Sequence, residues 1–268
     1  MIWTIVPILG GEFGMVRDDI KFTGGDPAIS NMVPSLLFLL TNGEQQIVVD
    51  TSYGDPKEVE AMGLVVKRDV PYQDRLAEAG IIPGRVKAVF LTHTHWDHAG
   101  NCGCFANAKI YCQQKDYDFA LSAASDYAPG LRTLLRNSAP RFIFLDGDGE
   151  MLPGLRYIAI GGHTPGSQML EVNTGHGRVF ITGDDVMTFA NVEQNIPVGL
   201  CVNPSGCQKA LDLIRSAGGS IVLPSHDYRT LEYLASPERC RFVCSACGFN
   251  TPPLGAVFYQ QSICFTGY

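Results

Sequence analysis

Short apolar runs alternate with polar and glycine-rich stretches along most of the chain. Runs of strand length occur at residues 2–9, 35–40, 46–49, 86–91, 109–112, 142–145, 155–160, 169–172, 178–181 and 221–223. Runs this short, bounded by turn residues, predict β-strands. The turn around Asn42-Gly43 and the turn at 173–177 each join two such runs, so both predict β-hairpins.

Helical patterns fall between these strands, at residues 72–79, 113–122 and 208–217, and Gly80 is a typical helix stop. Residues 123–140 are less regular, with Pro129-Gly130 in the middle. We expect an irregular surface connection there, with a cover over a functional pocket as the alternative. Both halves of the chain repeat the order of strands, polar loop and helices, and no linker divides them. The pattern predicts one domain over 1–268, with two mixed β-sheets face to face and helices on the outer faces.

Composition excludes several classes of protein. The chain has 268 residues, 46% of them hydrophobic, which is enough for a sizeable core. Its net charge is -7 and its basic residues are scattered, so we expect no nucleic-acid partner. The longest apolar run, 33–40, is too short to cross a bilayer and contains Pro34, and the apolar N-terminus has no basic residue before it. We therefore expect a cytoplasmic protein without a membrane partner; no pattern predicts its oligomeric state.

The nine cysteines cannot all pair within the chain, and without an export signal reduced thiols are expected. Cys240, Cys244 and Cys247 are closely spaced, and Cys264 follows them. A sulfur-ligated metal site is one interpretation of this spacing. Buried reduced cysteines are the favoured one, because free cysteine often behaves as a small core residue.

The segment 91–101 carries the densest chemistry in the chain. His93, His95, Asp97 and His98 lie within six residues, directly after the predicted strand 86–91. Imidazole and carboxylate groups are ligands for zinc and similar transition metals. Because alternate residues of an extended chain share a face, His93 and His95 can bind one ion. Asp97 and His98 follow where the chain turns and can serve a neighbouring ion.

Other predicted strands also end in polar residues. His163 lies in the glycine-rich loop 161–166, Asp184 and Asp185 follow the strand 178–181, and His226 follows the strand 221–223. Strand ends at one edge of a sheet converge, so these residues can meet the 91–101 segment. Asp50, after the strand 46–49, is either a strand terminator or an acid that orients a ligand. His176 lies at a hairpin tip and is expected to be solvent-exposed, without a function.

These motifs, taken together and in this order, resemble the metallo-β-lactamase superfamily over most of the chain. The resemblance implies a single domain with the αββα sandwich fold. It implies that His93, His95 and His163 bind one metal ion, that Asp97, His98 and His226 bind a second, and that Asp184 bridges them. Asp185 is the alternative bridge, and Asp50 matches the family's acid at the end of an early strand.

The implied cofactors are two zinc ions, with manganese or iron as alternatives. Two ions about 3.5–4 Å apart can share a hydroxide that attacks a carbonyl carbon. Asp184 would act as the catalytic bridge, and Asp97 would help to move a proton. The expected activity is therefore hydrolysis of a small-molecule substrate.

Beyond the metal ligands, the chain is most similar to the N-acyl homoserine lactonase-like branch. Those lactonases often place a tyrosine three residues after the bridging aspartate, where this chain has Met187; Tyr228 is a candidate substitute that would contact substrate. The prediction is a hydrolase of a small cyclic ester (lactone) or related cyclic amide. The alternatives are a thioester hydrolase of the glyoxalase II type, a mononuclear iron dioxygenase and a non-catalytic binding module.

Overall fold

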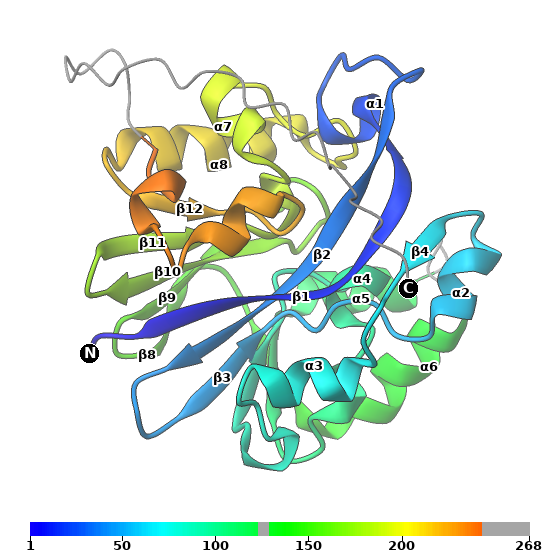
Figure 1. Ribbon diagram of the computed structural model, residues 1–268, viewed down its shortest axis with the longest axis vertical. Coiled ribbons are helices and arrows are strands. Elements are labelled where there is room, and N and C mark those ends of the chain that lie inside the picture. The colour runs from blue at the N-terminus through cyan, green and yellow to red at the C-terminus, as the bar shows by residue number, and fades with distance from the viewer. Residues whose placement is uncertain (123–128, 243–268) are drawn as a thin grey trace, which may run out of the picture.

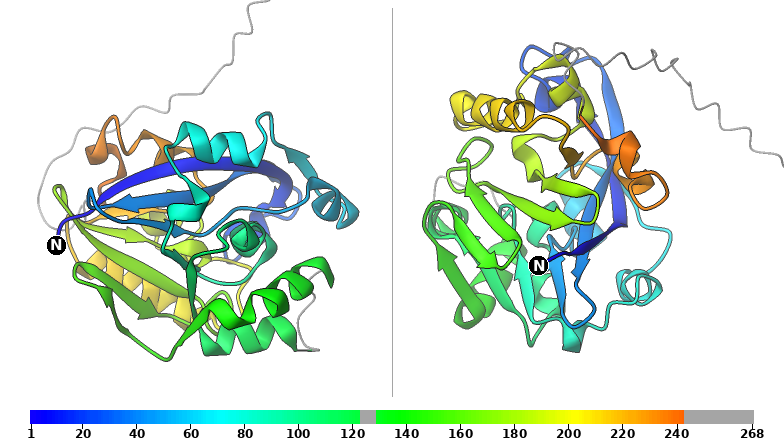
Figure 2. Two further views of the ribbon diagram at one scale, coloured as in Figure 1. Left: turned by 90° about the horizontal axis from the view of Figure 1, so that it is seen from below. Right: turned by 90° about the vertical axis from the view of Figure 1, so that its left-hand side faces the viewer.

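The structure, a computed structural model, describes residues 1–122 and 129–242 and contains two β-sheets that lie face to face (Figures 1 and 2). The larger sheet has seven strands in the order β4-β1-β2-β3-β5-β6-β7. They are β1 (Thr4–Arg17), β2 (Ser30–Thr41), β3 (Gln46–Val49), β4 (Val65–Lys67), β5 (Ala88–Phe90), β6 (Lys109–Gln113) and β7 (Phe142–Leu145). β3, β5, β6 and β7 are parallel, whereas β4, β1, β2 and β3 pair antiparallel, so the sheet is mixed.

The smaller sheet has five strands in the order β12-β11-β10-β9-β8. They are β8 (Gly149–Leu152), β9 (Leu155–Ala159), β10 (Gln168–Thr174), β11 (Gly177–Ile181) and β12 (Ile221–Leu223). β11 and β12 run parallel and the other pairs are antiparallel. Both hairpins predicted from the turns are confirmed, and His176 is exposed at the tip of the β10–β11 hairpin.

β2 shows why the molecule is layered. Its even-numbered residues Leu36, Phe38 and Leu40 pack in the core between the sheets, while Leu37 and Leu39 pack in a second core on the outer face of the larger sheet. Successive side chains of a strand point to opposite faces, so an uninterrupted apolar run is buried on both. The run at 35–40 therefore belongs to a central strand.

Helices cover both outer faces, which confirms the predicted αββα sandwich. α3 (Tyr72–Glu78), α5 (Gln114–Leu121) and α6 (Pro129–Ser138) contribute apolar residues to the outer core of the larger sheet. α8 (Pro204–Ser216) and α7 (Phe189–Gln194) pack against the smaller sheet, as Figure 1 shows. The remaining short elements are α1 (Asp18–Lys21), α2 (Pro56–Ala61), α4 (Trp96–Ala99) and the 3-10 turns η1 (Pro83–Arg85), η2 (Cys102–Cys104), η3 (Ala139–Arg141), η4 (Gly183–Asp185), η5 (Tyr228–Glu232) and η6 (Pro237–Cys240).

The first strand is longer than predicted. The sequence places it at 2–9, but β1 continues through its glycines to Arg17. A Cβ atom at Gly10 would lie 2.4 Å from Cβ of Ser52, and one at Gly11 would collide with the ring of Tyr53. These glycines are therefore sites of close packing against the 52–53 loop, and they do not end the strand.

The prediction of an irregular connection over 123–140 is wrong from residue 129 onward, where α6 begins. Leu131, Leu134 and Leu135 fall at helical spacing and pack against the larger sheet. Proline is tolerated in the first turn of a helix, so Pro129 starts α6 and does not break it. Residues 123–128 lie outside the described part of the chain.

Of the four cysteines that could form a sulfur site, one lies in the described part of the chain. Cys240 is buried and carries a free thiol, but Cys244, Cys247 and Cys264 lie outside the described residues.

Among the helices of the described chain, none combines the length and the apolar character needed to span a bilayer.

Candidate metal centre

The end of β5 delivers the 91–101 segment to the edge of the larger sheet. The chain bends at Thr92 and again at His95, which is the N-cap of α4. His93 and His95 bring ring nitrogens within 2.9 Å of each other, whereas the hydroxyl of Thr94 donates to Asp116. α4 starts at once with Trp96-Asp97-His98, so both metal-ligand pairs of the motif lie on one short stretch of chain.

Three further strand ends bring ligands to the same place. His163 lies in the loop between β9 and β10, Asp184 lies in η4 directly after β11, and His226 follows β12. All are at most 3% exposed. The expectation that these strand ends converge is therefore correct for the described residues.

His93, His95, His163 and Asp184 form the first ligand group, and one donor atom of each lies within 4.8 Å of the others. Nε2 of His93 and Nε2 of His163 are 2.9 and 2.8 Å from Nδ1 of His95. Oδ2 of Asp184 is 3.9 Å from Nε2 of His93 and 3.5 Å from Nε2 of His163. Three nitrogens and one carboxylate oxygen thus surround one point.

Asp97, His98, His226 and Asp184 form the second ligand group, with the same closeness of donor atoms. Oδ1 of Asp184 is 3.1 Å from Nε2 of His98 and 3.0 Å from Nε2 of His226. Oδ2 of Asp97 is 3.7 and 3.4 Å from the same two nitrogens. Asp184 directs one oxygen to each group, which is the arrangement of a bridging carboxylate.

The orientation of the imidazoles fits metal ions. Nδ1 of His163 is 2.6 Å from the carbonyl oxygen of Leu200, and Nδ1 of His226 is 2.7 Å from that of Pro34. Each ring must donate from Nδ1, which leaves the Nε2 lone pair directed at the centre. Oδ1 of Asp184 is buried and accepts no hydrogen bond of normal geometry from the described residues, despite its two nitrogen neighbours. A cation is the partner that these lone pairs lack.

The same packing shifts the pKa of several histidines in the cluster. Burial and the neighbouring imidazoles lower the pKa of His93 and His95 well below the ordinary value. Burial also lowers the pKa of His98, but Asp184 and other carboxylates outweigh it and the pKa ends well above normal. Neutral imidazole is the form that binds metal, so a bound cation would replace the protons held by the second group.

Asp50 orients His98. Its Oδ2 is 2.8 Å from Nδ1 of His98, and its two oxygens also accept hydrogen bonds from the backbone and hydroxyl of Thr92, at 2.8 Å each. Asp50 has a φ of 56°, a left-handed conformation that turns its side chain back toward the centre at the end of β3. The structure thus places it where the sequence expects an orienting acid.

Asp185 is buried beside the centre and supports the His163 loop. Its Oδ1 accepts hydrogen bonds from the backbone N–H of His163, at 2.9 Å, and from the hydroxyl of Ser167, at 2.8 Å. Burial raises the pKa of Asp185 to about 6. The geometry gives Asp184, and not Asp185, the position between the two ligand groups.

Asp116 is a buried acid that the sequence analysis overlooks. It lies in the first turn of α5 and accepts hydrogen bonds from Thr94 and Thr164, which belong to two different ligand loops. It lies three residues after the end of β6, whereas Asp50 directly follows β3. Its partners are threonines, so the sequence carries no metal-binding signal for it.

A pocket of about 210 Å³ opens onto the metal centre. Apart from the ligand residues, its lining is apolar: Phe13, Met15, Val16, Ile20, Met62, Leu64, Trp96, Met187 and Leu200. Tyr228 is not among these residues, and its hydroxyl donates a hydrogen bond to Glu12. The structure therefore does not bring Tyr228 to the pocket, whereas Met187 lines it.

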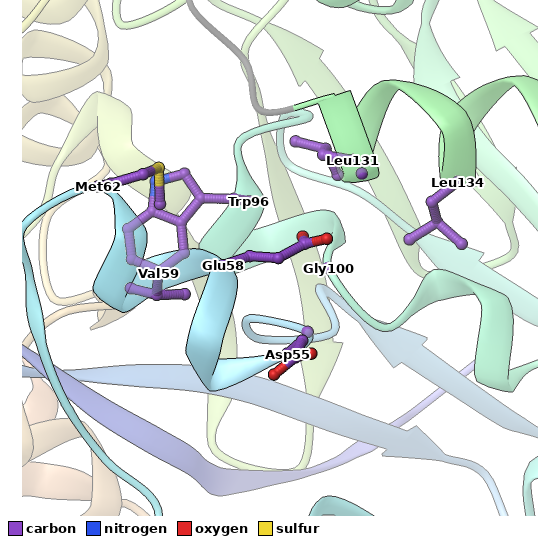
Figure 3. Close-up of a pocket in the computed structure, with 10 residues that line it drawn as sticks. Asp55, Glu58, Val59, Met62, Trp96, Gly100, Leu131 and Leu134 are labelled. Atoms are coloured by element: carbon purple, nitrogen blue, oxygen red, sulfur yellow. The ribbon is translucent and has the colours of Figure 1, made fainter.

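A second pocket, of about 220 Å³, lies on the other side of Trp96. Figure 3 shows the indole of Trp96 beside Met62, with Leu131 and Leu134 of α6 on one side and the carboxylates of Asp55 and Glu58 nearby. Trp96 and Met62 line both pockets and so form the wall between them.

Comparison with known proteins agrees with this geometry. The sequence profile of the Metallo-beta-lactamase superfamily matches residues 31–226, which include all the ligand residues. The chain belongs to this superfamily. It is 31% identical over 179 residues to an N-acyl homoserine lactonase of a Bacillus species, covering 62% of this chain and 69% of that protein. It is 25% identical over 234 residues to the N-acyl homoserine lactonase AttM of Agrobacterium fabrum, covering 78% and 87% of the two chains.

The similarity to solved structures covers a larger part of both chains than the sequence matches do. An N-acyl homoserine lactone hydrolase with N-hexanoyl-L-homoserine bound at its catalytic metal centre superposes with a TM-score of 0.71 at 25% identity, covering 85% of this chain and 95% of that one. A mutant of AiiA from B. thuringiensis with N-decanoyl-L-homoserine at its active site gives a TM-score of 0.72 at 25% identity and the same coverage. The chain is an enzyme of the metal-dependent hydrolase type, and the relatives named above belong to the lactonase-like branch.

Proposed function

We propose that this enzyme is a dinuclear metal-dependent hydrolase of small cyclic esters (lactones) or related cyclic amides. The observation that carries the proposal is the position of Asp184, whose two oxygens face two separate histidine groups. The lactonase relatives support the choice of a carbonyl in a small ring as the reacting group. In this proposal the seven residues of the two groups are the metal ligands, and Asp97 and Asp184 are also the catalytic residues.

Two ions held by these groups would lower the pKa of a shared water and polarise the substrate carbonyl. The protein's own contribution is to fix the geometry. The Nδ1 anchors hold the imidazoles in one tautomer, and Asp184 sets the distance between the two groups. Asp97 is buried at the pocket wall, and burial raises its pKa. A carboxylate there can take a proton from the attacking water and return it to the leaving alkoxide.

The pocket lining supports a neutral substrate with an apolar substituent. None of the described residues that line it is a lysine or an arginine, so a substrate carboxylate would find no cationic partner. Glutathione thioesters carry such carboxylates, which makes a thioester hydrolase of the glyoxalase II type the weaker proposal. A mononuclear iron dioxygenase is also weaker, because the second ligand group would have no role in it.

Zinc is the proposed metal, with manganese or iron as alternatives, because four donors of nitrogen and carboxylate type suit all three. The proposed location is the cytoplasm and the proposed partner is the small-molecule substrate alone.

Metal analysis and a substrate screen together test this proposal. Protein loaded with zinc is expected to hold two ions per chain and to hydrolyse alkyl-substituted γ-lactones faster than glutathione thioesters. One tightly bound iron, with oxygen consumed in the presence of a thiol, would show that the dioxygenase alternative is correct. Two ions with activity only on glutathione thioesters would keep the metal centre and overturn the substrate class.

A further inference from the structure

Asp116 is fully buried, 0% exposed, yet it lies outside both ligand groups. Its Oδ2 accepts two hydrogen bonds from Thr94, one from the backbone N–H and one from the hydroxyl, each at 2.6 Å. Its Oδ1 accepts a hydrogen bond from the hydroxyl of Thr164. A buried carboxylate is costly unless it is fully hydrogen-bonded, so this position has a defined role.

The two threonines connect Asp116 to the histidines of the first ligand group. Thr94 separates His93 from His95, and its hydroxyl donates to Asp116 while the ring nitrogens of the two histidines meet at the centre. Thr164 directly follows His163. One carboxylate thus holds the segments that carry all three histidines of this group.

The loop that carries His163 also packs closely against the backbone of α5. A Cβ atom on Gly166 would lie 2.4 Å from the backbone nitrogen of Asp116 and 2.7 Å from its Cβ. The 163–166 loop therefore rests directly on the first turn of α5. This packing leaves little freedom for the loop to move relative to Asp116.

The second ligand group has different anchors. Asp50 holds His98, and the carbonyl oxygen of Pro34 holds His226. The hydrogen bonds that Asp116 accepts from described side chains come only from Thr94 and Thr164, neither of which adjoins these two histidines. Asp50 also reaches the first group, because the hydroxyl of Thr92, which donates to Asp50, is 3.2 Å from Nδ1 of His93. Asp116, in contrast, has no described contact with the second group.

We propose that Asp116 is a positioning residue for the first metal ion alone. The proposal rests on the proposed two-metal function. Loss of an outer partner of a metal ligand typically lowers metal affinity by about 10–100-fold. Removing the Asp116 carboxylate is therefore expected to lower the affinity for the first ion by about that factor and to leave the affinity for the second ion unchanged.

The test compares metal binding in D116N, D50N and the wild type. The amide of D116N keeps the size of the side chain but has one accepting oxygen in place of two, so it cannot accept from both Thr94 and Thr164. D118N is the matched control, because Asp118 lies on the same helix but is exposed. Each protein is titrated with zinc against a chelator, and manganese-loaded samples are examined by electron paramagnetic resonance.

D116N is expected to retain one ion of wild-type affinity and to show the spectrum of an isolated manganese ion in place of a coupled pair. D118N is expected to bind two ions as the wild type does. D50N should lower the affinity for the second ion, through His98, and for the first as well, through Thr92 and His93. Of the two variants, only D116N is therefore expected to affect one ion alone. The ion retained by D116N shows that the chain is folded; if D116N does not fold, T164V removes only the hydrogen bond to the His163 loop and should weaken the same ion.

Two unchanged affinities in D116N and T164V would overturn the positioning role, and so would equal weakening of both ions in D116N. A wild-type chain that binds fewer than two ions would instead contradict the proposed function. The two failures are therefore distinguishable in one set of titrations.

Discussion

Replacement of Trp96 by alanine tests whether the indole limits the substrate's length. Trp96 is half-buried and separates the metal pocket, about 210 Å³, from the pocket beside α6, about 220 Å³. W96A should join them into one channel, because it removes Trp96 from the common wall that Trp96 and Met62 form. We expect the variant to accept γ-lactones with longer alkyl chains than the wild type does.

The magnitude follows from burial of apolar surface. Each methylene that enters the joined channel contributes about 0.8 kcal/mol, which is about a fourfold increase in kcat/KM per methylene. Trp96 packs edge-to-face on Phe13, with ring centroids 4.8 Å apart, so W96A should also destabilise the fold. We expect about 2 kcal/mol, below the range for fully buried tryptophan.

The assay measures kcat/KM for a series of γ-alkyl lactones of increasing chain length. In the wild type kcat/KM should stop rising once the metal pocket is full, whereas in W96A it should continue to rise. W96F keeps an aromatic wall and is the control. Metal content is measured first, because Trp96 lies between His95 and Asp97. Identical chain-length profiles for W96A, W96F and wild type, at equal metal content, would refute the reasoning.

Three further predictions concern the centre and its pocket. D184N should lower kcat/KM by about 10³-fold, because an amide bridges two cations poorly and the two cations supply several kcal/mol of transition-state stabilisation. An active variant with two tightly bound ions would contradict this. M187Y should raise kcat for γ-lactones about tenfold, because it places a hydroxyl that can hydrogen-bond the substrate carbonyl in a pocket whose described lining has none. An unchanged kcat would mean that the substrate carbonyl lies elsewhere. Removing the metals should lower the free energy of unfolding by about 2.7 kcal/mol per ion, or about 5.4 kcal/mol for two ions, relative to protein at free zinc 100 times Kd. Thermal unfolding with and without chelator measures this, and equal stability would argue against ions bound to the folded state.

The fold could be predicted because its central strands are apolar on both faces and are bounded by turn residues. β1 could not be predicted in full, because its glycines are explained only by contacts with Ser52 and Tyr53, far along the chain. α6 could not be predicted from Pro129-Gly130, because a proline is common both in the first turn of a helix and in loops. Both errors come from residues whose role depends on their position in the fold.

The ligand residues of the centre could be predicted because His and Asp side chains recur at strand ends. Asp116 could not, because its partners are threonines, which carry no metal-binding signal of their own. Tyr228 illustrates the reverse error: its hydroxyl was available in the sequence, but the fold directs it to Glu12. Candidate ligands that lie in a motif can be predicted from the sequence, whereas the hydrogen bonds that hold them in place are known only from the fold.

The lack of lysine and arginine among the described residues of the metal pocket also affects how substrate and enzyme meet in solution. With a net charge of -7 and no lysine or arginine among the described lining residues, the protein has no field that would draw in an anion. Diffusional encounter with a neutral lactone is therefore insensitive to dissolved salt, and kcat/KM should stay constant as ionic strength rises. An anionic substrate would instead be repelled most strongly at low ionic strength, where screening is weakest.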